Sequence, residues 1–319
     1  MRLFVLLYAV LSANAATIPQ RPLSSGNSGT PLPLLIWHGL GDRYDREGIK
    51  EVKELAEKAN PGTFVYPVRL SEDGSADQRA TFVGNVNEQV EYVCKDLASH
   101  PILSTAPAIN ALGFSQGGQF LRAYVERCNN PPVASLVTFG AQHNGIAEFQ
   151  ACKDGDWLCN GWEGILKGQT WTNFVQTTLV PAQYFRNPDD LENYLEYSNF
   201  LADINNERTK KNATYVENMK KLEKFVMYVF KNETTVVPKW SGWFDEFNLT
   251  SAKRTKLQDR TLYKEDWLGL RWLDERGRLV FKETEGRHMT LTDKLLMDTF
   301  TEYFSKRVDV LVAKESLDL

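Results

Sequence analysis

The sequence predicts an α/β fold with a mainly parallel central sheet and flanking helices. Short apolar runs such as 32–37 and 108–114 end abruptly at polar or glycine-containing loops, as buried parallel strands do. Between such runs lie segments with apolar residues at helical spacing, for example Ile49, Val52 and Ala56. Strands that alternate with helices indicate parallel pairing through crossover connections.

The expected strands and helices alternate through the first part of the chain. Pro61 and Gly62 end the first helix, because neither residue continues a helix well. Up to residue 139 we expect, in order, a strand at 32–37, a helix at 49–59, a strand at 63–68, a helix at 82–97, a strand at 108–114, a helix at 119–127 and a strand at 133–139.

The alternation stops between about residues 141 and 224. This stretch is polar, rich in Gly and Trp, and contains helix-like pieces such as 171–179. We interpret it as a helical cap inserted over the sheet. The core pattern then resumes with strands at 225–230 and 279–281 and a closing helix at 291–304. Residues 16–319 are therefore expected to form a single domain with a cap insertion.

The first fifteen residues have the pattern of a secretory signal peptide. Arg2 precedes an apolar run at 3–11, and Ala13-Asn14-Ala15 supplies a small-x-small cleavage site. The alternative interpretation is a hydrophobic N-terminal strand. No later run approaches the ~18 apolar residues that a membrane span needs. The mature protein is thus expected to be soluble, in a lumen or outside the cell.

The composition is that of an ordinary soluble protein. Of 319 residues, 42% are hydrophobic and 24% are charged, which is enough apolar material for a large core. The formal net charge is −4, and no block of basic residues occurs. Because phosphate binding needs clustered Lys and Arg, this argues against nucleic acid as a partner.

Four cysteines occur, and an oxidising compartment makes disulfides their expected state. Four cysteines allow three pairings. Cys152 and Cys159 are close in sequence and bracket a Gly-Asp turn, and pairing them would leave Cys94 with Cys128. A zinc site is the alternative, but no Cys-x-x-Cys or His-x-x-x-His spacing supports it. We expect no metal and no organic cofactor.

Three sequons fit the N-glycosylation pattern Asn-x-Ser/Thr. They begin at Asn212, Asn232 and Asn248. The pattern is short and arises by chance, but in a secreted chain each asparagine is a candidate for a surface glycan.

Residues 113–117 match the pattern Gly-x-Ser-x-Gly, between an expected strand and an expected helix. In that context the pattern indicates a nucleophile on a tight turn, as in the α/β-hydrolase fold. Side chains at Gly113 and Gly117 are expected to crowd each other across the turn. Ser115 would stand at a helix N-terminus, where free N–H groups stabilise negative charge. The alternative is a glycine-rich turn with an incidental serine.

A serine hydroxyl needs a base, and the candidate is His288. In this fold the chain order is serine, acid, histidine, so the base must follow Ser115. His143 follows the strand at 133–139 too early for an acid to intervene. His288 lies after the last short strand and before the closing helix, where the base is expected. The alternative is a surface or capping histidine.

The acid is expected in the loop after the strand at 225–230. Glu233 is the first carboxylate there, and Asp245 and Glu246 follow some twelve residues later. We therefore assign Glu233 to hold the imidazole in its tautomer and to stabilise the imidazolium. The alternative is a solvated loop glutamate.

The oxyanion hole is expected to use two backbone N–H groups. One belongs to Gln116, the residue after the nucleophile, and the other to the loop after the strand at 32–37. In that loop, 38–42 (HGLGD), Leu40 is the expected donor. Each such donor contributes roughly 10²–10³ in rate.

At these residues the chain resembles the palmitoyl-protein thioesterases of the lysosome. The resemblance extends over nearly all of the mature chain and goes well beyond the generic pentapeptide. Its segments are 33–42 (PLLIWHGLGD), 113–123 (GFSQGGQFLRA), 200–205 (FLADIN) with 207–208 (ER), 262–263 (LY) with 268–270 (LGL), and 284–288 (TEGRH).

The resemblance implies hydrolysis of long-chain fatty acyl thioesters, such as palmitate, on cysteines of S-acylated proteins or peptides. It also implies a lysosomal or vacuolar location and the bridges Cys94–Cys128 and Cys152–Cys159. Two departures stand out. The family usually has Asp where this chain has Glu233, and its cysteine pair after the oxyanion loop is absent around 43–46.

The catalytic residues alone do not choose between thioesters and oxyesters. A thiolate leaves more easily than an alkoxide, because a thiol pKa near ~8.5 is far below that of an alcohol. A secreted lipase or carboxylesterase is therefore one alternative, and a non-catalytic lipid or protein binder on the same scaffold is another. The cap offers apolar candidates for an acyl groove, which are Trp171, Phe174, Leu179 and Val180, although each could equally belong to the cap's own core.

Overall fold

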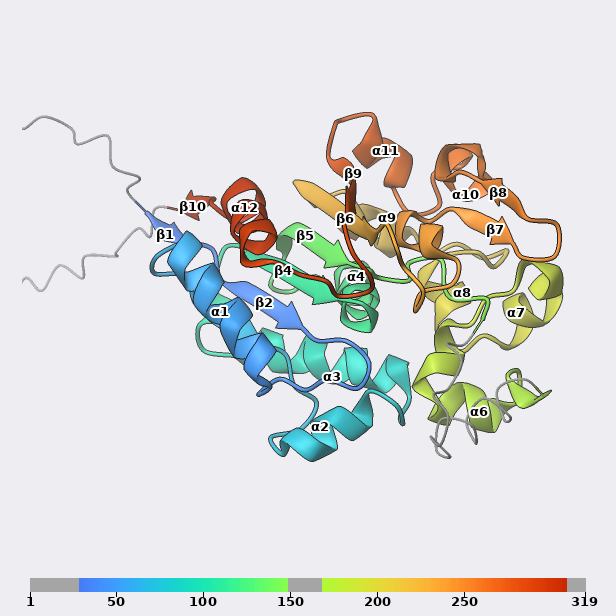
Figure 1. Ribbon diagram of the computed structural model, residues 1–319, viewed down its shortest axis with the longest axis horizontal. Helices are drawn as coiled ribbons and strands as arrows, with labels where there is room; N and C mark the ends of the chain where they lie inside the picture. Colours follow the sequence, from blue (N-terminus) through green and yellow to red (C-terminus); the bar gives the residue numbers. More distant parts are fainter. Residues whose placement is uncertain (1–28, 149–167, 309–319) are drawn as a thin grey trace, which may run out of the picture.

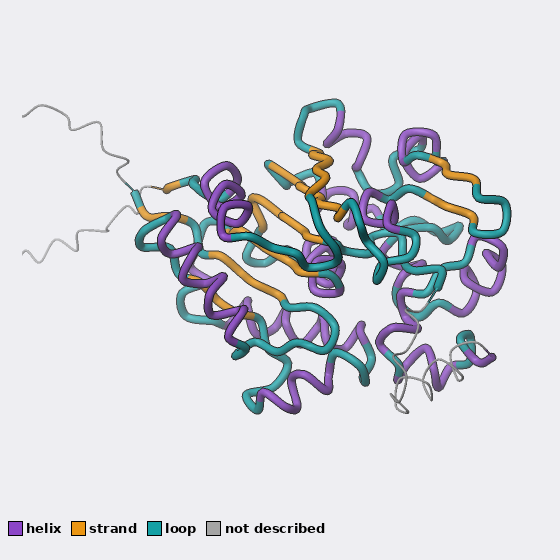
Figure 2. The backbone as a smooth tube through the Cα atoms, viewed as in Figure 1, coloured by secondary structure: helices purple, strands orange, loops and turns teal. Residues whose placement is uncertain are grey.

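The computed structural model describes residues 29–148 and 168–308 (Figure 1). The expected signal peptide and the cysteines Cys152 and Cys159 lie outside the described residues. A six-stranded sheet, drawn in orange in Figure 2, runs through the molecule. Its strand order is β3-β2-β4-β5-β6-β9, and every pairing in it is parallel. The strands are β2 Leu34–Trp37, β3 Val65–Pro67, β4 Ile109–Phe114, β5 Val133–Phe139, β6 Lys224–Phe230 and β9 Leu279–Thr284.

Helices cover both faces of this sheet, because its strands are apolar on both sides. Along β6, Phe225 and Met227 face one layer, while Val226 and Tyr228 face the other, as period-two alternation requires. The first layer contains α3 Val86–Ser99 and α4 Gln116–Arg127, and the second contains α1 Glu47–Ala59 beside α12 Asp293–Tyr303 (Figure 1). The prediction of an α/β-hydrolase fold with a mainly parallel sheet and flanking helices is confirmed.

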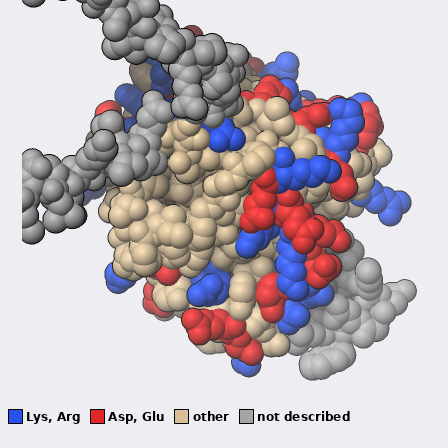
Figure 3. Space-filling model, turned by 90° about the vertical axis from the view of Figure 1, so that its left-hand side faces the viewer, with Lys and Arg blue, Asp and Glu red and all other residues tan. Residues whose placement is uncertain are grey.

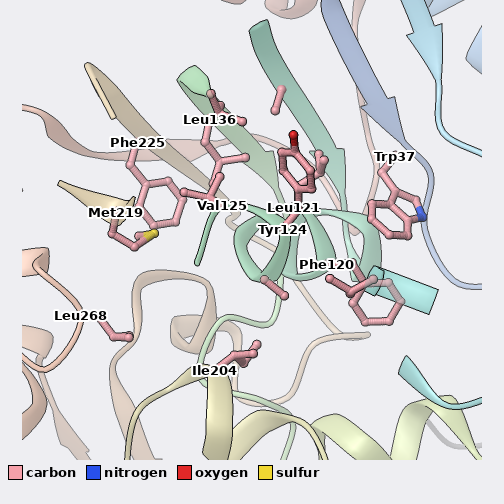
Figure 4. Packing of buried hydrophobic residues seen from close by; sticks show 14 of the residues in the cluster. Trp37, Phe120, Leu121, Tyr124, Val125, Leu136, Ile204, Met219, Phe225 and Leu268 are labelled. Atoms are coloured by element: carbon pink, nitrogen blue, oxygen red, sulfur yellow. The ribbon is translucent and has the colours of Figure 1, made fainter. Parts of the chain in front are cut away.

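The larger core cluster fills the space between the sheet and α4. Figure 4 shows Trp37 of β2, Phe120 and Tyr124 of α4, and Phe225 of β6 in this cluster. The edge of Phe120 meets the ring of Trp37, with centroids 5.5 Å apart. Helix α4 is buried along almost its whole length. The helix that follows Ser115 is therefore held rigidly by packing.

Between β5 and β6 the described chain is helical. It forms α6 Asn173–Thr178, α7 Leu191–Tyr197, α8 Leu201–Ile204 and α9 Ala213–Met219. Helices α6, α7 and α8 lie at the end of the molecule toward which β2 and β4 point (Figure 1). A buried arginine joins this segment to α4, since Arg122 donates to Ile204 O at 2.9 Å and to Asn205 Oδ1 at 2.8 Å.

Several elements were not predicted, and their sequences explain why. Helix α2, Gly74–Ala80, is short and polar, so apolar spacing does not reveal it. The same holds for the hairpin of β7 Glu246–Asn248 and β8 Lys253–Thr255. The short helices α10 Thr261–Lys264 and α11 Leu270–Asp274 were also missed, as was the pairing of β1 Thr30–Pro31 with β10 Arg307–Val308.

Some predicted bounds were wrong. The helix expected at 82–97 begins at Val86, because Asn85 caps it by accepting a hydrogen bond from Asn87 N. The helix expected at 119–127 begins at Gln116, directly after the serine. Strand β9 extends to Thr284, beyond the expected 279–281, because its backbone pairs with β6 as far as Phe230.

The structure joins Cys94 of α3 to Cys128 at the end of α4, with Cα atoms 6.0 Å apart. This is the pairing that the family resemblance implied.

Of the sequon asparagines, Asn212 and Asn232 are exposed. Asn248 ends β7, and its amide donates to Asp189. Basic and acidic side chains are interspersed on the face drawn in Figure 3.

We predict that Glu126 makes the stability of this protein pH-dependent. Burial raises the pKa of Glu126 to about 7, although Arg122, which donates to it at 2.7 Å, opposes the shift. Because the folded-state pKa lies above the ordinary value of 4.5, the folded state binds this proton more tightly. The contribution of Glu126 to stability is thus fully present below pH ~4.5 and is lost as the pH rises to ~7.

The measurement is denaturant unfolding of the wild type and Glu126→Gln between pH 4.5 and 7.5. On lowering the pH, the free energy of unfolding of the wild type should rise relative to the variant by up to about 3 kcal/mol. A difference between the two proteins that stays constant over this range would contradict the prediction.

Candidate active site

Ser115 occupies the turn between β4 and α4. Its backbone has φ +49° and ψ −120°, a conformation that a residue with a side chain rarely adopts. The turn is held by a hydrogen bond from Ser115 N to Phe139 O of β5, 2.8 Å long. The hydroxyl consequently stands at the carboxyl edge of the sheet and at the N-terminus of a buried helix, as Gly-x-Ser-x-Gly predicts.

The glycines of the motif are required because backbone atoms stand where their side chains would lie. A Cβ at Gly113 would lie 2.3 Å from Gly118 Cα. A Cβ at Gly117 would lie 2.3 Å from Trp37 O and 2.4 Å from His38 O. A Cβ at Gly113 would also lie 2.9 Å from the carbonyl carbon of Gly117, so the crowding at Gly113 involves the backbone of both Gly117 and Gly118. Gly113 lets α4 approach its own strand, and Gly117 lets α4 approach the end of β2.

Ser115, His288 and Glu233 form one continuous hydrogen-bonded chain. His288 Nε2 lies 3.0 Å from Ser115 Oγ, and His288 Nδ1 lies 2.6 Å from Glu233 Oε2. A carboxylate only accepts hydrogen bonds, so Nδ1 carries the proton and Nε2 accepts from the serine hydroxyl. The three residues follow β4, β9 and β6, whose carboxyl ends lie at one edge of the sheet.

Glu233 is held as a carboxylate by its surroundings. Its side chain is 1% exposed, and Oε1 accepts from Thr235 N at 2.7 Å and Val236 N at 3.1 Å. Burial favours the neutral acid, but the hydrogen bond and charge of His288 and the two backbone N–H groups outweigh it. The pKa of Glu233 is therefore lowered from its ordinary value of 4.5.

The alternative acids are engaged elsewhere. Asp245 Oδ2 forms an ion pair with Arg254 at 2.6 Å, and its Oδ1 accepts from Leu257 N at 2.8 Å. Glu246 forms an ion pair with Arg186 at 2.7 Å. Among the contacts of the described residues, neither carboxylate meets His288.

The other histidines are also accounted for. His143 is fully buried, its Nε2 lies 3.0 Å from Thr138 Oγ1, and its ring stacks on Phe244. Burial, followed by the charge of Arg122, lowers the pKa of His143 well below 6.5, so its ring stays neutral. His38 Nε2 lies 3.0 Å from Asp77 Oδ2. His100 packs beside Tyr66, with ring centroids 5.0 Å apart.

The two expected oxyanion donors belong to the two backbone segments next to the serine. Gln116 is the first residue of α4, and Leu40 lies in the loop after β2. Among the hydrogen bonds of the described chain, neither backbone N–H has an acceptor. The loop passes directly by the serine, since a Cβ on Gly39 would lie 3.2 Å from Ser115 Cβ. Both N–H groups are thus available to a substrate oxygen.

Asp77, on the unpredicted helix α2, supports the loop at residues 38–42, which we call the Leu40 loop. Besides facing His38, its carboxylate accepts from Tyr44 N at 3.0 Å and from Leu70 N at 2.7 Å. Burial would raise the pKa of Asp77, but these hydrogen bonds, that of His38 first, lower it below 3.8. The sequence carries no signal for this role, because a polar stretch gives no indication that one of its carboxylates is fully buried.

The four apolar candidates for an acyl groove differ in how far their side chains are exposed. Leu179 and Val180 are buried, at 2% and 0% exposure, and belong to apolar clusters of the structure. Trp171 is half-buried and donates to Asp190 Oδ2 at 2.7 Å. Phe174 of α6 is 69% exposed. A cavity of about 480 Å³ lies elsewhere, beside α3 and α4, and its lining includes none of the three hydrogen-bonded residues.

Comparison with known proteins identifies the family. The family model for palmitoyl protein thioesterase matches residues 33–288. The chain belongs to this family. Palmitoyl-protein thioesterase 1 of Caenorhabditis elegans is 36% identical over 307 residues, which cover 95% of this chain and 100% of the relative. Palmitoyl-protein thioesterase 3 of Dictyostelium discoideum is 34% identical over 275 residues, 86% of this chain and 89% of the relative.

More distant similarities are of the same general kind. Lysosomal thioesterase PPT2-B of Xenopus laevis is 25% identical over 267 residues, 82% of this chain and 87% of that protein. Among solved structures, the RedJ thioesterase of Streptomyces coelicolor aligns over 92% of this chain and 97% of its own, with 15% identity and a TM-score of 0.43.

We predict that Glu233→Gln lowers kcat by several orders of magnitude. The amide no longer favours the tautomer with a proton on Nδ1, and it does not stabilise the imidazolium. Steady-state thioester hydrolysis, normalised to folded protein, measures the effect. The matched control is Asp245→Asn, which should leave kcat within about threefold, because Asp245 does not meet His288. If the control loses activity and Glu233→Gln does not, the assignment is wrong.

Proposed function

We propose that this protein removes long-chain fatty acyl groups, such as palmitate, from cysteine thioesters of S-acylated proteins or peptides. The observation that carries the proposal is the chain of hydrogen bonds from Glu233 through His288 to Ser115, at 2.6 Å and 3.0 Å. Membership of the palmitoyl-protein thioesterase family supports the substrate class.

The reaction is a double displacement through an acyl-enzyme. His288 Nε2 takes the proton of Ser115 as its oxygen attacks the thioester carbonyl, and the oxyanion accepts hydrogen bonds from Leu40 N and Gln116 N. The C–S bond breaks, and the proton on Nε2 passes to the departing sulfur. Water then gives a proton to His288 and attacks the acyl-serine carbonyl. The bond between this carbon and Ser115 Oγ breaks, and His288 returns the proton to Oγ. The products are a free thiol and a fatty acid, with no cofactor consumed.

The setting we propose is the secretory pathway, with delivery to a lysosome or vacuole or export. The signal-peptide pattern of residues 1–15, the Cys94–Cys128 bridge and the relatives named lysosomal thioesterases support it. The described part of the chain contains no helix long and apolar enough to cross a bilayer. A lowered pKa keeps Glu233 ionised in an acidic lumen, where an ordinary glutamate would begin to protonate.

We further propose that the helical segment between β5 and β6 is the cap of a single domain. Its position at the end of the molecule to which β2 and β4 point supports this (Figure 1). In the same proposal, Asn212 and Asn232 carry glycans, since both asparagines are exposed. Asn248 is a weaker acceptor, because its amide already donates to Asp189. Cys152 pairs with Cys159.

We expect Ser115→Ala to abolish turnover, because the variant has no atom that can form the acyl-enzyme. Binding of fatty acid should survive, since the substitution removes only one oxygen. Hydrolysis of a palmitoyl-cysteine peptide by purified wild type and variant, with fatty-acid binding measured alongside, tests this. Full activity in the variant would refute the proposal.

Two further measurements separate the alternatives. A fluorophosphonate should label the wild type and fail to label Ser115→Ala, whereas a non-catalytic binder would be labelled in neither form. Kinetics on palmitoyl-cysteine peptides and on p-nitrophenyl esters, compared as kcat/KM, should favour the thioester. A preference for the oxyester would instead support a lipase or carboxylesterase.

A further inference from the structure

We propose that Thr81 and Gln78 are positioning residues of the oxyanion hole. Gln78 lies in α2, and Thr81 directly follows the last residue of that helix. Together they hold the Leu40 loop at a fixed place relative to the N-terminus of α4. The inference rests on the proposed function, because it concerns the rate of acyl transfer to Ser115. Residues 43–46, directly after this loop, contain no cysteine, so the loop is held by hydrogen bonds and not by a disulfide there.

Hydrogen bonds hold three successive peptide units of the Leu40 loop. The Gly39–Leu40 unit is held by its carbonyl, since Gly39 O accepts from Asp42 N at 3.3 Å and faces His38 Nδ1 at 3.2 Å. In a trans peptide the C=O and N–H point in opposite directions. Leu40 N–H is thus turned away from these partners, and it has no acceptor among the described residues.

The next two peptide units are held by Thr81 and Gln78. Gly41 N donates to Thr81 Oγ1 at 2.9 Å, and Gly41 O accepts from Gln78 Nε2 at 2.6 Å. The Gly41 backbone has φ +77°, a conformation that favours glycine and turns the chain sharply at this point. The side chains of Thr81 and Gln78 therefore bind the backbone N–H and C=O of Gly41, the residue that follows the expected donor Leu40.

Thr81 also contacts the segment that carries the second donor. Its carbonyl accepts from Gln116 Nε2 at 3.3 Å, and Gln116 Oε1 accepts from Tyr184 OH at 3.0 Å. Burial raises the pKa of Tyr184, so its hydroxyl remains a donor. Thr81, Gln116 and Tyr184 are 3%, 2% and 3% exposed. A single buried residue thus bridges the two segments whose N–H groups must converge on one oxygen.

The hydroxyl of Thr81 both accepts and donates a hydrogen bond. It accepts from Gly41 N and donates to Gln78 O at 2.7 Å. Valine has nearly the same shape but would leave the Gly41 N–H without its acceptor. Because an unpaired buried N–H is costly, we expect the loop to move until this group finds another partner. Oxyanion donors act at about 2.7–3.1 Å, and a misplacement near 1 Å costs on the order of a hundredfold in rate. The loss should therefore appear in kcat.

The experiment compares Thr81→Val, Thr81→Ser and Gln78→Met in the purified enzyme with a palmitoyl-cysteine peptide. We expect Thr81→Val to lower kcat by about 10- to 100-fold with KM changed less than about threefold. It should slow fluorophosphonate labelling similarly, because that reaction also develops charge on an oxygen in the hole. Thr81→Ser, which keeps the hydroxyl, should stay within about threefold of wild type, and Gln78→Met should fall between them.

Thr63→Val is the matched control. Thr63 Oγ1 donates to Leu32 O at 2.8 Å. The substitution therefore removes another hydrogen bond between a threonine hydroxyl and the backbone, before β2 and β3 and away from the loop. This control should lose thermal stability without losing kcat per folded molecule.

The proposal is overturned if folded Thr81→Val keeps wild-type kcat and labelling rate. It is equally overturned if Thr81→Ser loses as much as Thr81→Val, since that would indicate packing and not the hydroxyl. Should Thr81→Val fail to fold, wild-type kcat in Gln78→Met decides against the proposal. A wild type that neither hydrolyses the peptide nor reacts with the fluorophosphonate would refute the proposed function itself, a result that does not depend on Thr81.

Discussion

The close approach of three backbones around Ser115 is the constraint on which the site depends. Strand β4, helix α4 and the end of β2 come so near to one another that Gly113 and Gly117 have no room for a Cβ. This approach fixes the serine in an uncommon backbone conformation, and the first N–H of α4 has no acceptor among residues 29–148 and 168–308. Strain at one residue is sustained because the buried helix and the parallel sheet over-determine its position.

A second level of organisation places side chains distant in sequence around that turn. The loops after β6 and β9, which are adjacent strands, place the carboxylate and the imidazole, while the loop after β2 passes beside Ser115. Gly140, which follows β5, has φ +57°, and a Cβ there would lie 3.0 Å from His288 Cε1. Each loop contributes one group, and the parallel order of the strands makes the groups converge.

Much of this arrangement could be predicted from the sequence, because buried parallel strands have near-continuous apolar patterns. The ends of those strands located Ser115, and chain order then selected His288 and Glu233. The polar supports could not be predicted. Asp77 and Thr81 lie in a short polar stretch, and only the three-dimensional structure shows that their side chains are buried against the Leu40 loop. The spacing of apolar residues also could not tell whether Leu179 and Val180 pack inside the cap or line a groove.

The antiparallel pairing of β1 with β10 has a practical consequence. Thr30 lies opposite Val308, so the two extremities of the described chain meet at one end of the molecule, remote from α6 and α7 (Figure 1). A short peptide could join them, and the β7–β8 turn offers a place for new termini. Such a circular permutant would keep every strand of the central sheet intact.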